Sequence, residues 1–417
     1  MSSDSNNTQP QPKSWDCGGT GHLLPMERAK ASFDVFKMSC ALYGSKENVA
    51  RRRFIIGPID NGGPDLYEES RDVAQMKGVD NFIQIHKDFT TKNFRPQQND
   101  VGYMSENSTR TGGIMPCFLL FLPTVMGQAS DEQIALWYPK TLRFEMVGAY
   151  CQTELSHGSN VRGIETTATF DKETGDFILH SPNLGSTKWW NSGTGCIATH
   201  GAVFAKLLIP QANGEVKDFG IHCFLVQFRD ESHIPLPGIE LGDVGVKLGD
   251  NGLESGYIRF NKVRIPREHL MAKRQYVTRD GQYIKREAGM KAGSEFAHYM
   301  TMVRARAGTV AQCAGKLSAA ATIAARYSCV RQQGYNSNGV ESAIIEYRIQ
   351  RFRVMRTIAH SYAFRFTSTY MIDKMAQLSQ RITAGEDLTD IAEIHAASSG
   401  LKSVCTRLAC DGIEDAR

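Results

Sequence analysis

Residues 164–180 read IETTATFDKETGDFILH, and this stretch decides the class of fold. Its two ends, 164–170 and 177–180, are short runs of β-branched and apolar residues, a composition typical of β-strands. Between them lies the polar segment DKETGD, whose Gly175 can adopt the positive φ that a tight connection needs. We therefore expect a β-hairpin here, and with it a β-sheet in the middle of the chain.

The same texture continues on both sides of the hairpin. Further strand candidates lie at 202–209, 222–228 and 257–265, each bounded by turn-forming residues. The change from helical to strand-like texture begins near Phe144, and the last clear strand ends at about Arg267. We expect one middle β domain, barrel-like or sandwich-like, over residues 146–285.

Helical periodicity precedes the β region, from about residue 26 to residue 137. The residues 130–133, SDEQ, have the form of a capping box, and we expect the helix that they open to end at Pro139. Near the start of this region, apolar residues recur at helical spacing and predict a buried stripe: Phe33, Phe36, Met38, Leu42 and Tyr43.

Helical periodicity also follows the β region, at 309–332, 342–375 and 388–410, with Gly315 and Gly385 as its notable interruptions. An order of helices, strands and helices is not the alternation of a doubly wound sheet, and no strand leads into a Gly-x-Gly-x-x-Gly loop. The sequence predicts an α+β multidomain protein. Its parts are a flexible tail at 1–22, an N-terminal α-helical domain at 23–145, the β domain, and a C-terminal α-helical bundle at 286–417.

Composition narrows the classes of function without naming one. The chain has 417 residues, of which 41% are hydrophobic and 22% charged, with a formal net charge of +4. The one basic run, 51–53, is expected on a solvated helix face rather than in a nucleic-acid or anionic-ligand patch. The ten cysteines are scattered without metal-ligand spacing, and no run of about 18 apolar residues occurs. We expect a soluble protein of a reducing compartment, with no structural metal, no nucleic-acid partner and no membrane span.

The densest cluster of chemically distinctive residues is 150–163, YCQTELSHGSNVRG, at the entry to the β domain. It combines hydroxyls, glycines, an amide and charged groups in a stretch without periodicity. Loops of this kind present backbone and hydroxyl donors to ligands. His157 in this loop is expected to be satisfied by backbone rather than to act in catalysis.

Six motifs in order resemble those of the acyl-CoA oxidases, within the wider acyl-CoA dehydrogenase family. FLPTVMGQA at 121–129 and CQTELSHG at 151–158 are similar to that family's entry into its flavin domain. KWWNSGTG at 188–195 is similar to the Lys-Trp-Trp-x-x-Gly signature of the oxidases. PLPG at 235–238, GDVG at 242–245 and RIPR at 264–267 follow in the family's order. The resemblance covers about residues 33–417.

The resemblance implies that the middle β domain binds FAD. It implies that Thr153 hydrogen-bonds the edge of the isoalloxazine ring and that the loop at Ser192 and Gly193 passes close to the flavin. Many relatives have two glycines where this chain has Ser192 and Gly193. Trp189 and Trp190 are candidates for a wall of the flavin site, and the alternative for either is core filling.

Two arginines match cofactor positions of the family's C-terminal helices. Arg331 matches an arginine that reaches the FAD pyrophosphate of the neighbouring protomer, and a guanidinium suits a phosphate through its planar fork. Arg306 falls on another arginine position of this domain. An interhelical or surface ion pair is the alternative for each. If both bind FAD, the protein is a homodimer with FAD near the protomer interface.

The resemblance also implies the reaction, which is FAD-dependent oxidation of a fatty acyl-CoA to a trans-2-enoyl-CoA in the peroxisome. In an oxidase, O2 accepts the electrons and hydrogen peroxide forms. The family's glutamate base resembles one in a Glu-Gly-x-Asn segment of a second C-terminal helical domain, and this chain has no such segment. Glu154 and Glu295 are the alternatives, and the sequence supports neither, so we assign no catalytic residue.

Two rival functions stay open. One is an acyl-CoA dehydrogenase that passes electrons to a protein acceptor. The other is a homologue that binds FAD or acyl-CoA without turnover, which the missing base favours. Acyl chain length and branching depend on the shape of a pocket, which these motifs do not specify.

Overall fold

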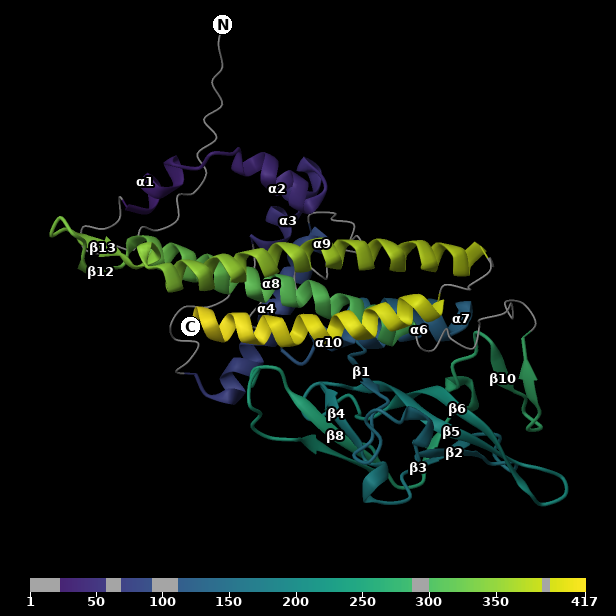
Figure 1. Ribbon diagram of the computed structural model, residues 1–417. Helices are drawn as coiled ribbons and strands as arrows, with labels where there is room; N and C mark the ends of the chain where they lie inside the picture. Colours follow the sequence, from purple (N-terminus) through teal and green to yellow (C-terminus); the bar gives the residue numbers. More distant parts are fainter. Residues whose placement is uncertain (1–22, 58–68, 92–111, 287–299, 385–390) are drawn as a thin grey trace, which may run out of the picture. The chain divides into compact units, whose positions relative to one another are not determined.

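The computed structural model describes residues 23–57, 69–91, 112–286, 300–384 and 391–417. It divides into two compact units, which are described separately here. The sheet unit comprises Ile55–Gly308 and Met371–Gly400, and the helical unit comprises Met1–Phe54, Thr309–Tyr370 and Leu401–Arg417. The expected tail at 1–22 lies outside the described residues. Helices, then strands, then helices follow one another along the chain, which confirms the predicted α+β multidomain class (Figure 1).

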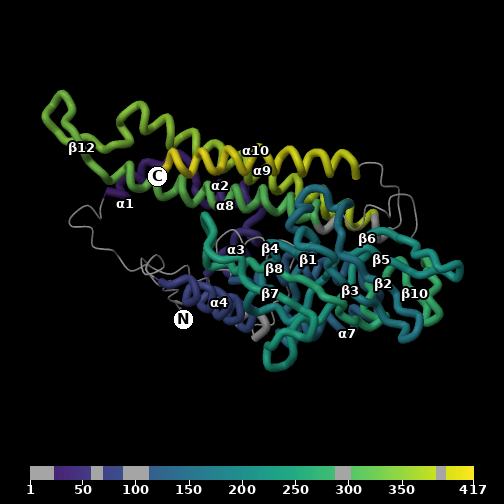
Figure 2. The backbone as a smooth tube through the Cα atoms, turned by 90° about the horizontal axis from the view of Figure 1, so that it is seen from below, coloured from purple at the N-terminus to yellow at the C-terminus, as the bar shows by residue number. Residues whose placement is uncertain are grey.

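The larger sheet has six strands, and one of them, β5 (His200–Pro210), pairs with three of the others. β1 (Gly148–Cys151) and β2 (Thr167–Phe170) pair with it in parallel at successive positions, and β6 (Val216–Gln227) pairs with it antiparallel. β3 (Phe177–His180) and β9 (Val263–Ile265) complete the order β1-β5-β2-β3-β9. β5, β6 and β2 lie side by side in both views of the chain (Figures 1 and 2).

The smaller sheet has the order β4-β8-β7, all antiparallel. Its strands are β4 (Lys188–Ser192), β8 (Ser255–Phe260) and β7 (Ile239–Asp243). Buried side chains of both sheets share one core, in which Phe224 and Phe177 of the larger sheet belong to the same cluster as Ile258 and Phe260 of the smaller. This shared core is the sandwich-like middle region that the sequence predicts. It fixes β4, the strand on which most of the predicted flavin contacts lie.

The hairpin of β2 and β3 forms where it is expected. Phe170 pairs with Phe177, and Gly175 has φ +78° in the connection. The first strand is shorter than predicted, because Val161–Gly163 form a 3-10 turn and the ladder begins only at Thr167. The predicted strand at 257–265 is instead two strands, β8 and β9, which belong to different sheets. Lys262, with φ +54°, turns the chain between them.

Helices precede the strands in the sheet unit: α4 (Arg71–Thr91), the π-helical turn Cys117–Phe121, α6 (Leu122–Gln128) and α7 (Asp131–Leu142). The capping box is confirmed, with Ser130 Oγ accepting from the Gln133 N–H and Gln133 Oε1 accepting from the Ser130 N–H. The expected helix end at Pro139 is wrong, since α7 continues to Leu142. Pro139 has no N–H to donate to the preceding turn, but its own carbonyl still accepts from the Arg143 N–H, so the chain stays helical for one more turn. The remaining strands are a hairpin of β10 (Gln275–Val277) and β11 (Tyr283–Lys285).

Three long helices carry the C-terminal part of the chain, as predicted, but their bounds differ from the predicted ones. They are α8 (Met300–Val330), α9 (Arg348–Ala384) and α10 (Ile391–Ala416), and α8 and α9 are joined through the hairpin β12 (Gln332–Tyr335) and β13 (Glu341–Ala343). The first begins earlier than predicted, the other two begin later, and the predicted helical start at 342–347 is wrong, because β13 and a 3-10 turn occupy it. Gly315 lies inside α8 without breaking it, and Gly385 lies outside the described residues. In the helical unit, α8, α9 and α10 share a core that contains Leu317, Phe364 and Ala409.

The short N-terminal helices α1 (Leu23–Ala29), α2 (Val35–Tyr43) and α3 (Lys46–Ile56) correct one prediction. The apolar stripe of α2 is not buried: Phe33, Phe36 and Met38 are exposed in the described part of the chain, and α2 has no buried residue. The predicted helix containing the run 51–53 is confirmed, but its arginines also contact aromatic rings. Arg52 lies 4.8 Å from the centroid of the Tyr43 ring. At Tyr43, the predicted stripe thus contacts an arginine side chain.

Candidate functional site

The loop that holds Thr153 is fixed against β4 by backbone hydrogen bonds. The Trp189 N–H donates to the Thr153 carbonyl at 2.9 Å, and the Leu155 N–H donates to the Thr187 carbonyl at 2.9 Å. Glu154 and Lys188 form a single antiparallel bridge between these two bonds. The Thr153 hydroxyl itself has no hydrogen bond to any residue that the structure describes. The position of Thr153 is thus set by its backbone, and its hydroxyl is free to bind a ligand.

A β-bulge in β4 brings Trp190 out of the ladder. Trp189 pairs with Tyr257 and Asn191 pairs with Gly256, so Trp190 is the extra residue between them. Its φ is +67°, a left-handed conformation that is rare for a bulky residue, and its side chain is 57% exposed. Trp189, in contrast, stacks on Tyr257 with 5.9 Å between ring centroids. A strained, exposed aromatic beside an ordered one is typical of a binding site.

The end of β4 turns sharply at Gly193. This glycine has φ +91° and follows Ser192, which is half-buried and pairs with Ser255. Within the turn, the N–H groups of Ile197 and Ala198 both donate to the Gly193 carbonyl, at 2.9 and 2.7 Å. A side chain at Gly193 would be strained by its φ alone. Gly193 is buried, with Gly113 and Ala198 beside it, so the turn is closely packed at the end of β4.

Under the Thr153 loop lies a fully buried ion pair between Glu154 and Lys188, whose side chains are both 0% exposed and 3.0 Å apart. Glu154 also accepts from the Thr166 hydroxyl at 2.6 Å, and Lys188 also donates to the Phe204 carbonyl at 2.7 Å. Burial raises the pKa of Glu154, but Lys188 and the donors around it outweigh burial and hold that pKa below its usual value. The Glu154 carboxylate is therefore ionised and occupied. Its remaining donors are Lys188, His157 and the backbone N–H groups of Glu165 and Thr166.

This network decides two open questions about the loop. His157 contacts Glu154, with 3.1 Å between Nδ1 and Oε2, so the histidine is part of the buried network, satisfied by a side chain rather than by backbone as expected. Glu154 cannot act as a free catalytic base, because both of its oxygens accept hydrogen bonds. Glu295, the other carboxylate considered from the sequence, lies outside the described residues.

The two arginines matched from the sequence lie in different units. Arg306 is half-buried in the sheet unit, where its Nη1 lies 3.2 Å from His395 Nδ1 and 3.3 Å from Ser399 Oγ on α10. Arg331 is exposed in the helical unit at the end of α8, and its Nη2 donates to Gln333 Oε1 at 3.4 Å. Arg306 thus makes an interhelical contact, while Arg331 keeps an exposed guanidinium.

Two buried charged groups that bind the turn after β4 were not predicted from the sequence. Arg229 donates to the carbonyls of Thr194 and Ala198 at 2.8 and 2.5 Å. Glu254 accepts from the Gly195 N–H at 2.6 Å. Neither residue belongs to one of the six motifs. The folding of the sheets brings both to the turn from distant parts of the sequence. Arg229 directly follows the predicted strand 222–228 and precedes Asp230, a position that by itself indicates no buried role.

Four of the six predicted cofactor residues thus lie along β4 and the loop paired with it: Thr153, Trp190, Ser192 and Gly193. They provide an uncommitted hydroxyl, an exposed indole and a closely packed glycine turn. These groups fit a planar heteroaromatic ring, which needs hydrogen bonds at its edge and an apolar wall at its face. Their role toward FAD stays a prediction. Arg306 and Arg331 are not among the residues that the sheets bring together.

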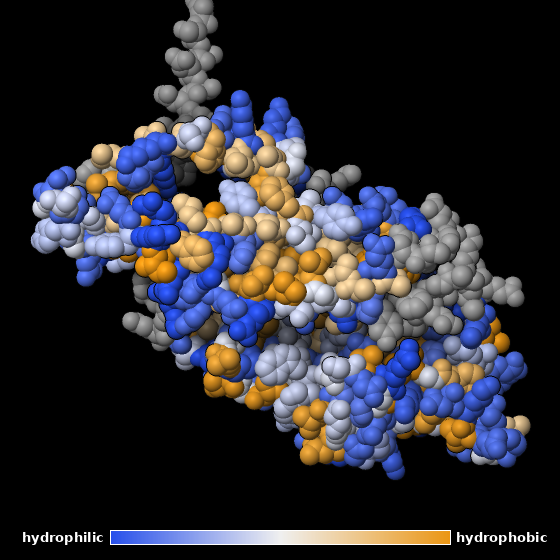
Figure 3. Space-filling model, viewed as in Figure 1, coloured by the Kyte–Doolittle hydropathy of each residue, from blue (hydrophilic) through white to orange (hydrophobic). Residues whose placement is uncertain are grey.

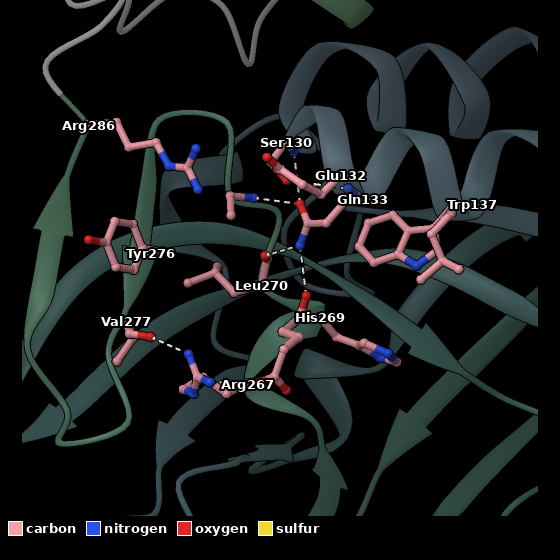
Figure 4. A pocket seen from close by; sticks show the side chains of 13 residues that line it. Ser130, Glu132, Gln133, Trp137, Arg267, His269, Leu270, Tyr276, Val277 and Arg286 are labelled. Atoms are coloured by element: carbon pink, nitrogen blue, oxygen red, sulfur yellow. Dashed lines mark hydrogen bonds and ion pairs between the residues drawn. The ribbon is translucent and has the colours of Figure 1, made fainter.

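A cavity of about 390 Å³ lies elsewhere in the sheet unit, between the start of α7 and the segment 267–286 (Figure 4). None of the predicted site residues lines it. Gln133 spans its wall, donating to the carbonyls of Glu268 and Leu270 at 2.7 and 2.8 Å. Arg286 lies 5.4 Å from the centroid of the Tyr276 ring. The lining carries charges of both signs, and the Gln133 amide already donates to two carbonyls. We therefore interpret this cavity as the place where α7 packs against the segment 267–286, not as a second ligand site.

No helix in the described ranges is long and apolar enough to span a membrane. No group of three or more His, Cys, Asp or Glu side chains there is placed to hold a metal ion.

Comparison with known families gives three matches in succession. The acyl-coenzyme A oxidase N-terminal family matches residues 34–147, and the acyl-CoA dehydrogenase middle domain matches residues 149–263. The C-alpha1 domain of acyl-CoA oxidase matches residues 299–417. The order and the spacing of the three are those of one continuous protein.

Individual relatives agree with these matches. Peroxisomal acyl-coenzyme A oxidase 1 of Arabidopsis thaliana is 40% identical over 411 residues, which are 96% of this chain and 59% of the relative. Peroxisomal acyl-coenzyme A oxidase 1 of Rattus norvegicus is 34% identical over 94% of this chain and 59% of its own length. This chain thus spans 59% of the length of these relatives.

Solved structures match as closely. Acyl-CoA oxidase-2 of Caenorhabditis elegans, bound with FAD, ascaroside-CoA and ATP, has a TM-score of 0.84 and 34% identity, covering 94% of this chain and 59% of that one. Arabidopsis thaliana acyl-CoA oxidase 1 has a TM-score of 0.83 at the same identity and coverage. Both the ordered motifs and the backbone therefore lead to one conclusion: this chain belongs to the acyl-CoA oxidase family.

Proposed function

We propose that this chain is the FAD- and acyl-CoA-binding part of an enzyme that oxidises fatty acyl-CoA to trans-2-enoyl-CoA and passes the electrons to O2, giving hydrogen peroxide. The observation that carries the proposal is the bulge of β4, which exposes Trp190 on the strand that is hydrogen-bonded to the Thr153 loop and that ends at the Gly193 turn. The Caenorhabditis elegans acyl-CoA oxidase-2 was solved with FAD and an acyl-CoA, which supports the same ligands here.

Each residue of the site has a distinct task in this proposal. The Thr153 hydroxyl donates to the edge of the isoalloxazine ring, and the Trp190 indole covers part of its face. The turn at Gly193 ends β4 without a side chain and so shapes the edge of the site beside Ser192. FAD, when bound, supplies the redox chemistry of the hydride transfer. The protein contributes orientation and the exclusion of water.

Removal of the α-proton needs a carboxylate base that is not tied up in the fold. Glu154 does not meet this condition, because Lys188 and four other donors occupy it. We therefore assign the base to no described residue of the Thr153 loop. This chain binds and orients the reactants, and full turnover depends on a carboxylate elsewhere in the active protein.

We also propose that the active form is a homodimer in which Arg331 of the partner subunit binds the FAD pyrophosphate. Arg331 is exposed, and its planar guanidinium suits a phosphate. Large apolar side chains are exposed on the same unit, and hydrophobic surface gathers over its helices (Figure 3). Exposed apolar surface of this kind is typical of association sites. The exposed apolar residues of α8 and α9 in this unit include Ile323, Tyr327, Ile349, Phe352, Met355 and Phe366.

A peroxisomal location is part of the proposal and is supported by the names of the Arabidopsis and rat relatives. Co-migration of the native protein with peroxisomal markers on a density gradient is the expected result. Recovery in the cytosolic or mitochondrial fraction would contradict this location without bearing on the chemistry.

The decisive experiment is the visible absorption spectrum of the purified chain with added FAD, followed by anaerobic addition of palmitoyl-CoA. A perturbed flavin spectrum that persists through gel filtration supports FAD binding, and a free-FAD spectrum contradicts it. Bleaching by palmitoyl-CoA means that the chain contains its own base. Bound flavin that stays oxidised means that the chain binds the cofactor without turnover.

Peroxide formation separates the oxidase from the rival dehydrogenase, which the match to the acyl-CoA dehydrogenase middle domain keeps open. The test uses the native protein with palmitoyl-CoA in air. Peroxide formed without any added acceptor supports the oxidase. Turnover that requires an artificial electron acceptor would identify a dehydrogenase.

A further inference from the structure

The turn after β4 is held from two sides by buried charged groups. Arg229, which is 4% exposed, donates to the carbonyls of Thr194, Gly195 and Ala198 at 2.8, 3.1 and 2.5 Å. On the other side, Glu254 Oε1 accepts from the Gly195 N–H at 2.6 Å. One guanidinium therefore binds three carbonyls of the turn 193–198, and one carboxyl group binds the Gly195 N–H.

Glu254 is the weaker of these two supports. It is 2% exposed, and its second oxygen, Oε2, is buried and makes no hydrogen bond of normal geometry in the described part of the chain, although the Gly193 N–H is close enough to lower the pKa of the carboxyl group. Oε2 lies in a narrow gap beside Gly113, since a Cβ added at Gly113 would lie 3.2 Å from it and 3.4 Å from Gly193 Cα. An ionised oxygen in such a place costs more free energy than the oxygen of a neutral carboxyl group does.

The charges around Glu254 come from three other elements and from the turn. Asp243 on β7 is ionised, because Arg71 of α4 binds both of its oxygens at 2.6 Å, and its negative charge disfavours a second one nearby. Arg229 lowers the pKa of Glu254, because its positive charge favours the ionised form. Burial raises the pKa of Cys196 in the turn, so this thiol stays neutral.

The balance of these effects favours the neutral acid. Burial first, and Asp243 after it, raise the pKa of Glu254 to about 7, against the opposing effects of the N–H groups of Gly195 and Gly193 and of Arg229. The closed turn therefore binds a proton that the solvated carboxyl group would release at a lower pH. Any motion that lets water reach Oε2 restores an ordinary carboxylate.

We propose that Glu254 is a positioning residue that closes the turn 193–198 in its neutral form and releases it on ionisation. The carboxyl group acts through the Gly195 N–H and does not touch the ligand, because both of its oxygens are enclosed. This part of the inference concerns the chain alone. A second part rests on the proposed function: FAD, which needs the closed turn at Gly193, binds more weakly as Glu254 ionises.

The first part is tested without FAD, by hydrogen–deuterium exchange of the peptide that covers 193–198. Because a raised pKa favours the protonated closed state, the protection of this peptide is high at low pH and falls as pH rises toward about 7. After correction for the intrinsic exchange rate, we expect a loss of roughly 50-fold between about pH 5 and about pH 8. The variant E254Q, which stays neutral, keeps its protection over the same range.

Two controls make this result specific. E240Q removes the same charge at an exposed position of β7, and it keeps the pH profile of the wild type. Protection of β5 and β6 reports the stability of the core and stays constant in all variants. Equal pH profiles for E254Q and the wild type would overturn the proposal. If E254Q fails to fold, the wild-type profile decides alone, and a flat profile overturns the proposal.

The second part is tested by titrating the apo-chain with FAD and following the quenching of flavin fluorescence. The wild type is expected to bind more weakly at about pH 8 than at about pH 6, by up to about tenfold where the open turn predominates, and E254Q equally at both. A uniform loss of affinity in E254Q would show a purely structural role. Absence of FAD binding in every variant at every pH would contradict the proposed function and leave the exchange result to stand on its own.

Discussion

The Thr153 hydroxyl is the side-chain group whose contribution to binding can be isolated most cleanly. Its backbone is fixed by the bond from Trp189, and its hydroxyl has no other partner in the described structure, so its removal leaves the fold unchanged. We expect T153A to weaken FAD binding about fivefold, the equivalent of one neutral hydrogen bond of about 1 kcal/mol. Flavin fluorescence titration measures this, and T153S, which keeps the hydroxyl, stays within about twofold of the wild type. Equal losses in T153A and T153S would contradict a hydrogen bond.

Trp190 makes a different kind of prediction, because its backbone is strained while its side chain is exposed. At φ +67° a glycine is favoured over any residue with a Cβ. We expect W190G to be about 1 kcal/mol more stable in urea unfolding than W190A. Both variants lose the indole, and both are expected to bind FAD about tenfold more weakly. If the indole fills the core instead, W190G and W190A both lose several kcal/mol of stability.

At the scale of elements, β4 and the loop before it are joined through the buried pair of Lys188 and Glu154. K188M leaves the Glu154 carboxylate buried without its cation, which is expected to cost about 3–5 kcal/mol in urea unfolding. The double variant K188M/E154Q removes the stranded charge and recovers part of that loss. The matched control is R407A, which breaks an exposed pair with Asp411 on α10 and changes stability by less than about 0.5 kcal/mol.

The same pair has a pH dependence of opposite sign to that of Glu254. The pKa of Glu154 is held below its usual value, so the stability that the pair contributes is present above the ordinary carboxyl range. It is lost as pH falls through the folded-state pKa. Acid unfolding of the wild type at a lower pH than K188M would agree with this, and coincident acid transitions would contradict it.

The elements also show which features the sequence could predict. The hairpin of β2 and β3 depends on local signals, a polar connection and Gly175, and it forms as expected. The split of 257–265 into two strands depends on partners in two different sheets, which no local pattern contains. The bulge at Trp190 is set by the register of β4 against β8, and Glu254 meets Gly195 only through that pairing. Motifs located the candidate site, whereas the charges that hold it are non-local.

On the scale of the whole molecule, the predicted cofactor residues are divided between the two units. Thr153, Trp190 and Gly193 belong to the sheet unit, and Arg331 belongs to the helical unit. Arg306 belongs to the sheet unit and already contacts His395 and Ser399, so it has less capacity for a phosphate than Arg331 has. Arg331 is therefore the residue that distinguishes a site built within one protomer from a site completed by its partner.

Complementation between two defective variants tests this arrangement directly. We expect T153A and R331Q each to weaken FAD binding, because each removes one half of the composite site. In a mixed dimer, the R331Q chain contributes an intact Thr153 and the T153A chain contributes an intact Arg331, so one of the two sites is complete. After random exchange of equal amounts, about a quarter of all sites should bind FAD with wild-type affinity. Fluorescence titration of the mixture counts these sites. The control is the T153A/R331Q double variant alone, whose dimers contain no complete site. If Arg331 acts within its own protomer, the mixture contains no complete site, and its titration is the sum of the two single variants.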